Sequence, residues 1–160
     1  MKIKNLIKTA LVSSALLSSS VAVSANEAPL FKKPHQAVEY RQATFTAIRH
    51  NFGQMRAMIG GKRKFDQKEF QQRADNLAAL AKMPWEAFLQ GTDMKSMEGN
   101  SSLPAIWQKN DEFTKLARLF EQNTAALAMA AKSGDKGKIK KALGKMGKEG
   151  CKACHNKFKD

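Results

Sequence analysis

Three features that would place a chain in a common class are missing from this sequence. Beyond residues 1–25, no stretch approaches the ~20 consecutive apolar residues of a membrane helix, so we expect no membrane contact. Tyrosine occurs once, and there is no arginine-rich run or recognisable nucleic-acid-binding motif, which argues against a nucleic-acid partner. No segment shows the sustained alternation of apolar and polar residues that is typical of strands. We therefore expect a soluble, all-α protein.

The first 25 residues have the composition of a secretory signal. Lys2, Lys4 and Lys8 form a charged start, an apolar stretch follows, and residues 23–25 (Val-Ser-Ala) supply small side chains for cleavage. We expect residues 1–25 to be removed on export and residues 26–160 to form the mature protein. About 135 residues suffice for one hydrophobic core and argue against a two-domain enzyme.

Positive charge exceeds negative charge and is concentrated near the C-terminus. The chain has 28 basic and 14 acidic residues, a net charge of +14. Residues 132–159 contain ten lysines but only two acidic residues, Asp135 and Glu149. Such a cluster can be a solvated surface that suits the negative end of a helix dipole, or a docking surface for an acidic partner.

The two cysteines indicate the chemistry. Cys151 and Cys154 are followed at once by His155, which makes the C-x-x-C-H signature of c-type haem attachment. On a helix these spacings place three side chains on one face, where two thiols can bond a haem and the imidazole can bind its iron. The alternatives are a zinc site, for which only His35 and His50 remain as further ligands, a redox dithiol and a disulfide loop. We predict one haem c, bound covalently through both cysteines, with His155 as the metal ligand.

Apolar periodicity predicts four helices, which implies an antiparallel four-helix bundle with one covalently attached haem between facing helices. Prolines and glycines mark several of the ends. The predicted segments are 34–59, about 67–82 with Asp66 and Glu69 as a capping box, 104–134, and 135 almost to the C-terminus.

The last predicted helix is rich in glycine and needs support from elsewhere. Gly137, Gly144, Gly147 and Gly150 each cost roughly 0.8 to 1 kcal/mol relative to alanine inside a helix. We expect the haem to stabilise this helix, with its ring close to the backbone of the glycines nearest the C-x-x-C-H motif.

One face of the first predicted helix is apolar except for Arg41. An arginine in such a stripe calls for an anion, which a haem propionate would supply; the alternative is a side chain that snorkels at the bundle end. The stripe consists of Val38, Arg41, Phe45, Ile48, Phe52, Met55 and Ile59.

The same helix offers no second ligand for the iron. Antiparallel packing would bring the end of the last helix close to Phe45, whose ring cannot coordinate a metal. His35 and His50 are expected on the surface, and Met55 and Met58 in the core. The predicted iron is therefore five-coordinate and suited to small neutral gases.

Five short sequence motifs along the chain resemble those of a known family: AVEYRQ at 37–42, NFGQM at 51–55, MPWEAF at 83–88, AIW at 105–107 and GCKACH at 150–155. With these motifs around a terminal C-x-x-C-H, the chain resembles the cytochrome c-prime family over nearly all of residues 26–160. The resemblance implies a periplasmic four-helix haem protein, commonly a homodimer packed through its first two helices. It also implies high-spin, five-coordinate iron that binds nitric oxide and carbon monoxide but has little affinity for dioxygen.

The resemblance also assigns roles to individual residues. It places Arg41 and Gln42 at the haem edge, Phe45 at the distal position and Phe88 in the pocket wall. Two positions depart from the family pattern, because Phe45 stands where leucine is frequent and Lys159 where arginine is frequent. An aromatic distal wall should slow the access of gases, and lysine lacks the planar fork of arginine.

Three functions compete at this stage. The favoured one is reversible binding of nitric oxide for storage, transport or protection. The second is electron transfer, with an acidic redox partner docked on Lys145, Lys148, Lys152 and Lys157. An enzyme is the least favoured, because no acid–base residue lies on the distal stripe to move protons.

Overall fold

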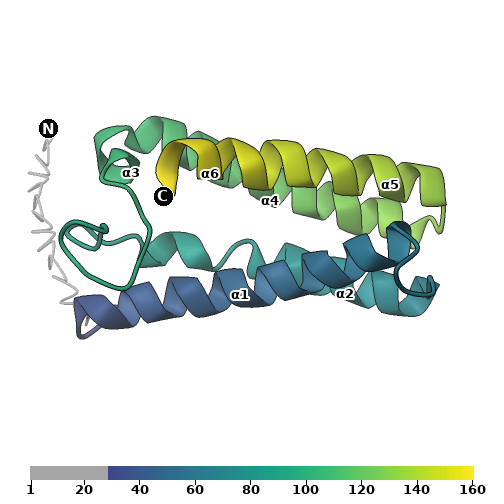
Figure 1. Cartoon of the computed structure of the whole chain (residues 1–160), viewed down its shortest axis with the longest axis horizontal. Coiled ribbons are helices and arrows are strands. Elements are labelled where there is room, and N and C mark those ends of the chain that lie inside the picture. The colour runs from purple at the N-terminus through teal and green to yellow at the C-terminus, as the bar shows by residue number, and fades with distance from the viewer. Residues whose placement is uncertain (1–28) are drawn as a thin grey trace, which may run out of the picture.

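Four helical rods lie side by side and antiparallel in this computed structural model, which describes residues 29–160 (Figure 1). The predicted all-α, antiparallel four-helix bundle is confirmed. The predicted signal peptide, residues 1–25, lies outside the described residues. The elements are α1 (Pro34–Ile59), α2 (Gln67–Leu80), the 3-10 turn η1 (Pro84–Ala87), α3 (Ala105–Gln108), α4 (Asn110–Lys132), α5 (Lys136–Lys145), the π-helical η2 (Met146–Lys152) and α6 (Ala153–Phe158).

Local signals at the helix ends explain the first two rods. α1 ends at Gly60, and Gly61 takes the left-handed backbone that glycine tolerates, with φ +76°. Asp66 caps α2 by accepting a hydrogen bond from the Glu69 amide at 2.7 Å. The capping box is only half formed, because the Glu69 carboxylate pairs with Arg63 and Arg73 instead of reaching back to the cap.

The third and fourth predicted helices are less regular than expected. Lys109, with φ −123° and ψ 47°, separates α3 from α4, so the prediction of one helix over 104–134 is wrong at this residue. The last rod changes to π-type hydrogen bonding over Met146–Lys152, so each helical turn around Cys151 contains more residues than an α-helical turn. Apolar periodicity detects neither feature, because both are changes of backbone geometry that leave the buried face apolar.

We call α5, η2 and α6 together the C-terminal rod. α1 packs on α2, α2 on α4, and α4 on the C-terminal rod, whereas α1 meets the C-terminal rod at few positions. Figure 1 shows α1 and α2 as one layer and α4 with the C-terminal rod as the other. We call the loosely closed contact between α1 and the C-terminal rod the open seam.

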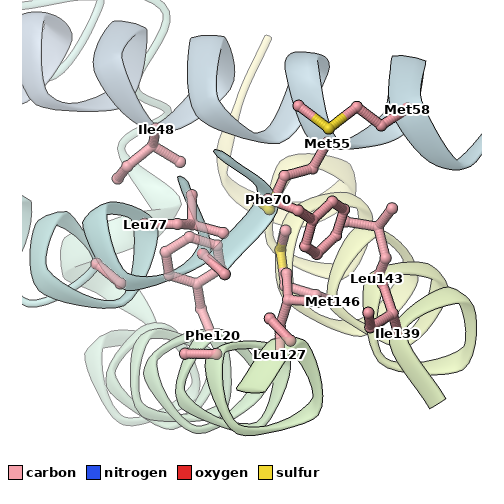
Figure 2. Close-up of a cluster of buried hydrophobic side chains, with 14 residues drawn as sticks. Ile48, Met55, Met58, Phe70, Leu77, Phe120, Leu127, Ile139, Leu143 and Met146 are labelled. Carbon is pink, nitrogen blue, oxygen red and sulfur yellow. The ribbon is translucent and has the colours of Figure 1, made fainter. Parts of the chain in front are cut away.

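The main core fills the bundle between all four rods (Figure 2). Met55 and Met58 are 0% and 3% exposed, which confirms the prediction that they are core residues. Side chains from α1, α2, α4 and the C-terminal rod contribute to this cluster: Ile48, Met55, Met58, Phe70, Leu77, Phe120, Leu127, Ile139, Leu143 and Met146.

A loop over residues 88–104 and the C-terminus close one end of the bundle. The Leu103 amide donates to the Phe158 carbonyl, and the Asp160 amide donates to the Ser101 carbonyl, each at 3.0 Å. Ser102 and Lys159 form an isolated antiparallel bridge between these hydrogen bonds. The loop is therefore attached to the segment that follows His155. Among residues 29–160, no helix is both long and apolar enough to cross a membrane.

Candidate functional site

A cavity of about 570 Å³ lies in the open seam, where α6 faces the first half of α1. Its volume is in the range of small-molecule and cofactor sites. Antiparallel packing brings together residues that are more than a hundred positions apart in the sequence. All seven residues predicted as site residues line this cavity: Arg41, Gln42, Phe45, Phe88, Cys151, Cys154 and His155. Their roles toward a haem stay predictions.

The two cysteines form no disulfide, and both lie in the cavity wall. Burial raises the pKa of Cys154 to about 11, with a further contribution from the neighbouring Cys151, and burial also raises the pKa of Cys151. The Cys151 Sγ lies 3.8 Å from the Met146 Sδ. Reactive redox dithiols have lowered thiol pKa values, so these environments argue against the redox interpretation of the C-x-x-C spacing.

His155 lies at the rim of the cavity, four residues after Cys151. Burial of the ring lowers its pKa, and the positive charge of Lys159 lowers it further. A lowered pKa favours the neutral ring, which is the form that binds a metal. No other histidine and no methionine lines this cavity, and His35 and His50 are exposed, as predicted.

The donor set fits a covalently held haem better than a bare metal ion. Within residues 29–160, no three His, Cys, Asp or Glu side chains converge on a point where they could hold an ion. Two thiols and one imidazole instead border a cavity whose walls are mostly aromatic and aliphatic. That arrangement suits a large apolar ring with one protein ligand to its iron.

The snorkelling alternative for Arg41 is wrong, whereas its contact with a haem propionate stays a prediction. It is only 2% exposed, so it does not snorkel to the surface. Its guanidinium donates to the Ala87 carbonyl at 2.9 Å, to the Thr92 hydroxyl at 2.7 Å, to the Thr92 carbonyl at 2.5 Å and to Asn100 Oδ1 at 3.3 Å. Burial lowers its pKa to about 10, which leaves it charged at neutral pH. Neutral acceptors already satisfy the group, so its burial does not by itself require an anion.

The remaining predicted residues form the walls near Arg41. Gln42 is exposed and donates through Nε2 to the Gly99 carbonyl at 2.8 Å. Phe45 and Phe88 lie edge to face, with ring centroids 6.4 Å apart. The Arg41 guanidinium lies 4.8 Å from the centre of the Phe88 ring. Hydrocarbon rings and one buried cation therefore surround the end of the cavity that faces α1.

Sequence reasoning missed five aromatic residues of the cavity wall. They are Phe52, Trp85, Phe113, Phe120 and Phe158. Phe113 and Phe120 belong to the predicted apolar stripe of the third helix, so the position of that stripe opposite the C-x-x-C-H motif could have indicated them. No sequence pattern indicated Phe158, which lies three residues after the C-x-x-C-H motif.

Comparison with known proteins identifies the family. The family model described as Cytochrome C' matches residues 36–159. Cytochrome c' from Rubrivivax gelatinosus is 40% identical over 130 residues, which cover 81% of this chain and 98% of that protein. The structure of cytochrome c prime from Shewanella frigidimarina has a TM-score of 0.77 and 46% identity, with 81% of this chain and 98% of that chain covered. This chain belongs to the cytochrome c' family.

Membership of this family identifies haem c as the cofactor. Cytochromes c' bind haem c, and the two cysteines of this chain are consistent with attachment through C-x-x-C-H. The chain is accordingly a c-type haem protein. Among the solved relatives is a nitric oxide complex of a mutant cytochrome c prime from Alcaligenes xylosoxidans, with a TM-score of 0.74 and 33% identity over 81% of this chain and 98% of that chain.

Two glycines of the last rod allow aromatic side chains to approach the backbone of this cytochrome c' near the motif. A Cβ at Gly150 would lie 2.9 Å from Cδ2 of Phe120, and a Cβ at Gly147 would lie 3.2 Å from Cζ of Phe52. The expectation that the haem ring lies close to the backbone of these glycines stays a prediction. In the structure the space beside them holds phenylalanine rings, which contribute to the walls of the open seam.

Proposed function

We propose that this cytochrome c' is a periplasmic protein that reversibly binds small neutral gases, nitric oxide above all, for binding or protection. The observation that carries the proposal is the composition of the cavity wall. His155 is the single imidazole there, and aromatic and aliphatic side chains of α1 and η1 line the cavity together with polar ones: Phe45, Ile48, Phe52 and Trp85 beside Arg41, Gln42, Thr46 and Arg49. Haem c, when bound, would be held by Cys151, Cys154 and His155, and its iron would supply a coordination site for small gases. The nitric oxide complex of the Alcaligenes xylosoxidans relative supports the choice of ligand.

The residues of the chain would set access and selectivity. Phe45 packs against Trp85 at 5.9 Å and against Phe88, so its ring is held in place on the α1 side. The aromatic part of this wall excludes water and offers no hydrogen bond to a polar or charged ligand. Small neutral molecules are the class that such a wall admits.

Absorption spectra of the purified ferrous protein, alone and under carbon monoxide or nitric oxide, test this function. We expect a five-coordinate, high-spin spectrum that changes with either gas. A six-coordinate spectrum that gas leaves unchanged would exclude the proposal.

The role of Phe45 has its own test. We expect Phe45→Leu to bind carbon monoxide about tenfold faster, which corresponds to ~1.4 kcal/mol off the access barrier. Phe65→Leu is the matched control, because Phe65 is half-buried and lies outside the cavity. Equal rates in the parent and Phe45→Leu would remove the gatekeeping role without touching gas binding itself.

Electron transfer is the alternative function, and the lysine-rich C-terminal rod supports it. It predicts that reduction by an acidic partner slows as ionic strength rises. An enzymatic role is not proposed: no Asp or Glu lines the cavity within the part of the chain that the structure describes.

Export and assembly complete the proposal. We infer that residues 1–25 direct the chain to the periplasm and that the mature protein is a homodimer packed through α1 and α2. Cell fractionation with N-terminal sequencing tests the first point. Sedimentation of the purified protein over a range of concentrations tests the second, and a monomer throughout would rule out the dimer.

A further inference from the structure

A second cavity lies in the open seam, on the side of Cys151 and His155 away from Arg41. Its volume is about 850 Å³, and both Cys151 and His155 line it as well as the first cavity. The second half of α1 forms one wall and the C-terminal rod forms the other. We call it the basic groove, after four cations in its lining: Arg56, Lys140, Lys148 and Lys152.

Glycine keeps the basic groove open. Gly144 and Gly147 both line it. A Cβ at Gly144 would meet nothing within 4 Å, which shows free space above the backbone at this residue. Phe52, Ile59 and Leu143 give the groove an apolar part. It therefore offers hydrocarbon surface and positive charge together.

The four cations of the basic groove have no acidic counterpart. Within residues 29–160, no Asp or Glu lines the groove and none of the four cations takes part in an ion pair. Three other lysines of the C-terminal region are paired: Lys138 with Asp135 at 3.9 Å, Lys145 with Glu149 at 3.8 Å, and Lys157 with Glu112. The lysine cluster thus includes both lysines paired with a carboxylate of the protein and unpaired lysines that line the groove.

We propose that the basic groove binds an acidic segment of a partner protein, one that carries apolar side chains between its carboxylates. Charge complementarity selects an acidic occupant. A free inorganic anion would leave the apolar part of the groove uncovered, and a flat anionic membrane cannot reach cations on two facing walls at once. An acidic peptide segment satisfies both the charges and the hydrocarbon surface.

Docking in this groove would reach the predicted iron ligand. The His155 ring makes no hydrogen bond with any residue in 29–160. Metal-bound histidines ordinarily donate their second ring N–H to a carboxylate, a carbonyl or water. A carboxylate of the docked segment would supply that acceptor and strengthen the bond from His155 to iron. This consequence rests on the haem c assignment, whereas docking does not depend on which gas binds.

Calorimetric titration of the haem-loaded protein with a short synthetic peptide of alternating glutamate and leucine tests the proposal. The comparison peptide has glutamine in place of glutamate. We expect saturable one-to-one binding of the acidic peptide and about tenfold weaker binding to the Lys140→Glu/Lys148→Glu variant. In the ferrous protein, the acidic peptide should also raise the iron–histidine stretching frequency seen by resonance Raman spectroscopy.

The matched control is Lys132→Glu/Lys141→Glu, with the same change in net charge on exposed lysines outside the groove. It should bind the peptide within about twofold of the parent. Equal losses in both double variants would overturn the proposal, as would inorganic phosphate or anionic phospholipid vesicles binding the parent more tightly than the peptide does. Carbon monoxide spectra of the same variants keep failure of docking distinct from failure of gas binding.

Discussion

Two contacts in this bundle are stabilised in different ways. One is the contact between α2 and α4, and the other is the open seam between α1 and the C-terminal rod. Phe70 and Leu77 of α2 and Leu127 of α4 are fully buried and fill their side of the core. Phe45 and Phe52 of α1 remain half-buried beside two cavities. Side chains alone stabilise the first contact, whereas the open seam leaves space for a cofactor. Substitutions in the α2–α4 contact should therefore mainly lower stability, whereas substitutions in the open seam should mainly affect the haem.

The largest effect is expected in the open seam, from Cys151→Ala/Cys154→Ala. Without either thiol the chain cannot hold haem covalently, so extraction with acidified organic solvent should remove all of it. Each single substitution leaves one thiol to bond the haem. Haem that stays with the unfolded double variant through denaturing chromatography would contradict the assignment of both cysteines.

In the filled part of the core, Phe70→Ala should lower the free energy of unfolding by about 3 to 5 kcal/mol, because it leaves a cavity among buried side chains. Phe88→Ala is the counterpart in the cavity wall. Its ring is half-buried, so we expect a smaller loss but an altered haem spectrum. Denaturant unfolding with absorption spectra measures both. A spectral change in Phe70→Ala alone would reverse the comparison.

Next in size is Arg41→Leu, which removes the donor from backbone and side-chain acceptors in η1 and the 88–104 loop. We expect a loss of about 2 to 4 kcal/mol in unfolding free energy, since a buried acceptor left without a partner costs ~1–3 kcal/mol. Arg49→Leu is the control, an exposed arginine of α1 that also lines the cavity, and it should change stability by no more than about 0.5 kcal/mol. Equal effects would mean that the loop contacts add nothing.

Two glycines of the last rod should respond with opposite signs. Gly150→Ala would push a methyl group into the Phe120 ring and cost about 1 to 3 kcal/mol. Gly144→Ala meets open space and should stabilise the helix by about 0.5 to 1 kcal/mol. Thermal unfolding of the two variants decides the matter, and stabilisation by both would show that Phe120 moves aside at no cost.

The smallest effect concerns acid pH and the start of the C-terminal rod. Hydrogen bonds from the amides of Lys138 and Gly137 lower the pKa of the Asp135 carboxyl that caps α5. A carboxyl with a lowered pKa stabilises the fold above its unfolded value of about 3.9, and that contribution disappears as pH falls through the lower folded value. Asp135→Asn keeps a capping oxygen that does not titrate. Its melting temperature should fall less between pH 5 and pH 2 than that of the parent, and identical slopes would exclude a role for Asp135.

Particular residues show how much of the structure could be predicted from the sequence. Helix α1 was predicted at Pro34–Ile59, its bounds in the structure, because a proline and two glycines mark its ends. The cap at Asp66 followed from the same local chemistry. The break at Lys109 and the π-helical η2 were not predicted, because the apolar pattern continues through both. The hydrogen-bond acceptors of Arg41 could not be predicted from the sequence either, since Thr92 lies 51 residues away in a loop without periodicity.

The sequence by itself determined the chemistry that depends on spacing: two thiols and an imidazole within five consecutive residues, and helices whose period and caps are local. Only the tertiary structure decided what surrounds that motif. Whether a cationic side chain meets a carboxylate or an empty groove depends on residues brought together from distant parts of the chain. Lys152 and Lys157 differ by five positions, yet the first faces the basic groove and the second pairs with Glu112 of α4, 45 residues away in the sequence. Packing between rods makes that difference, and no local pattern encodes it.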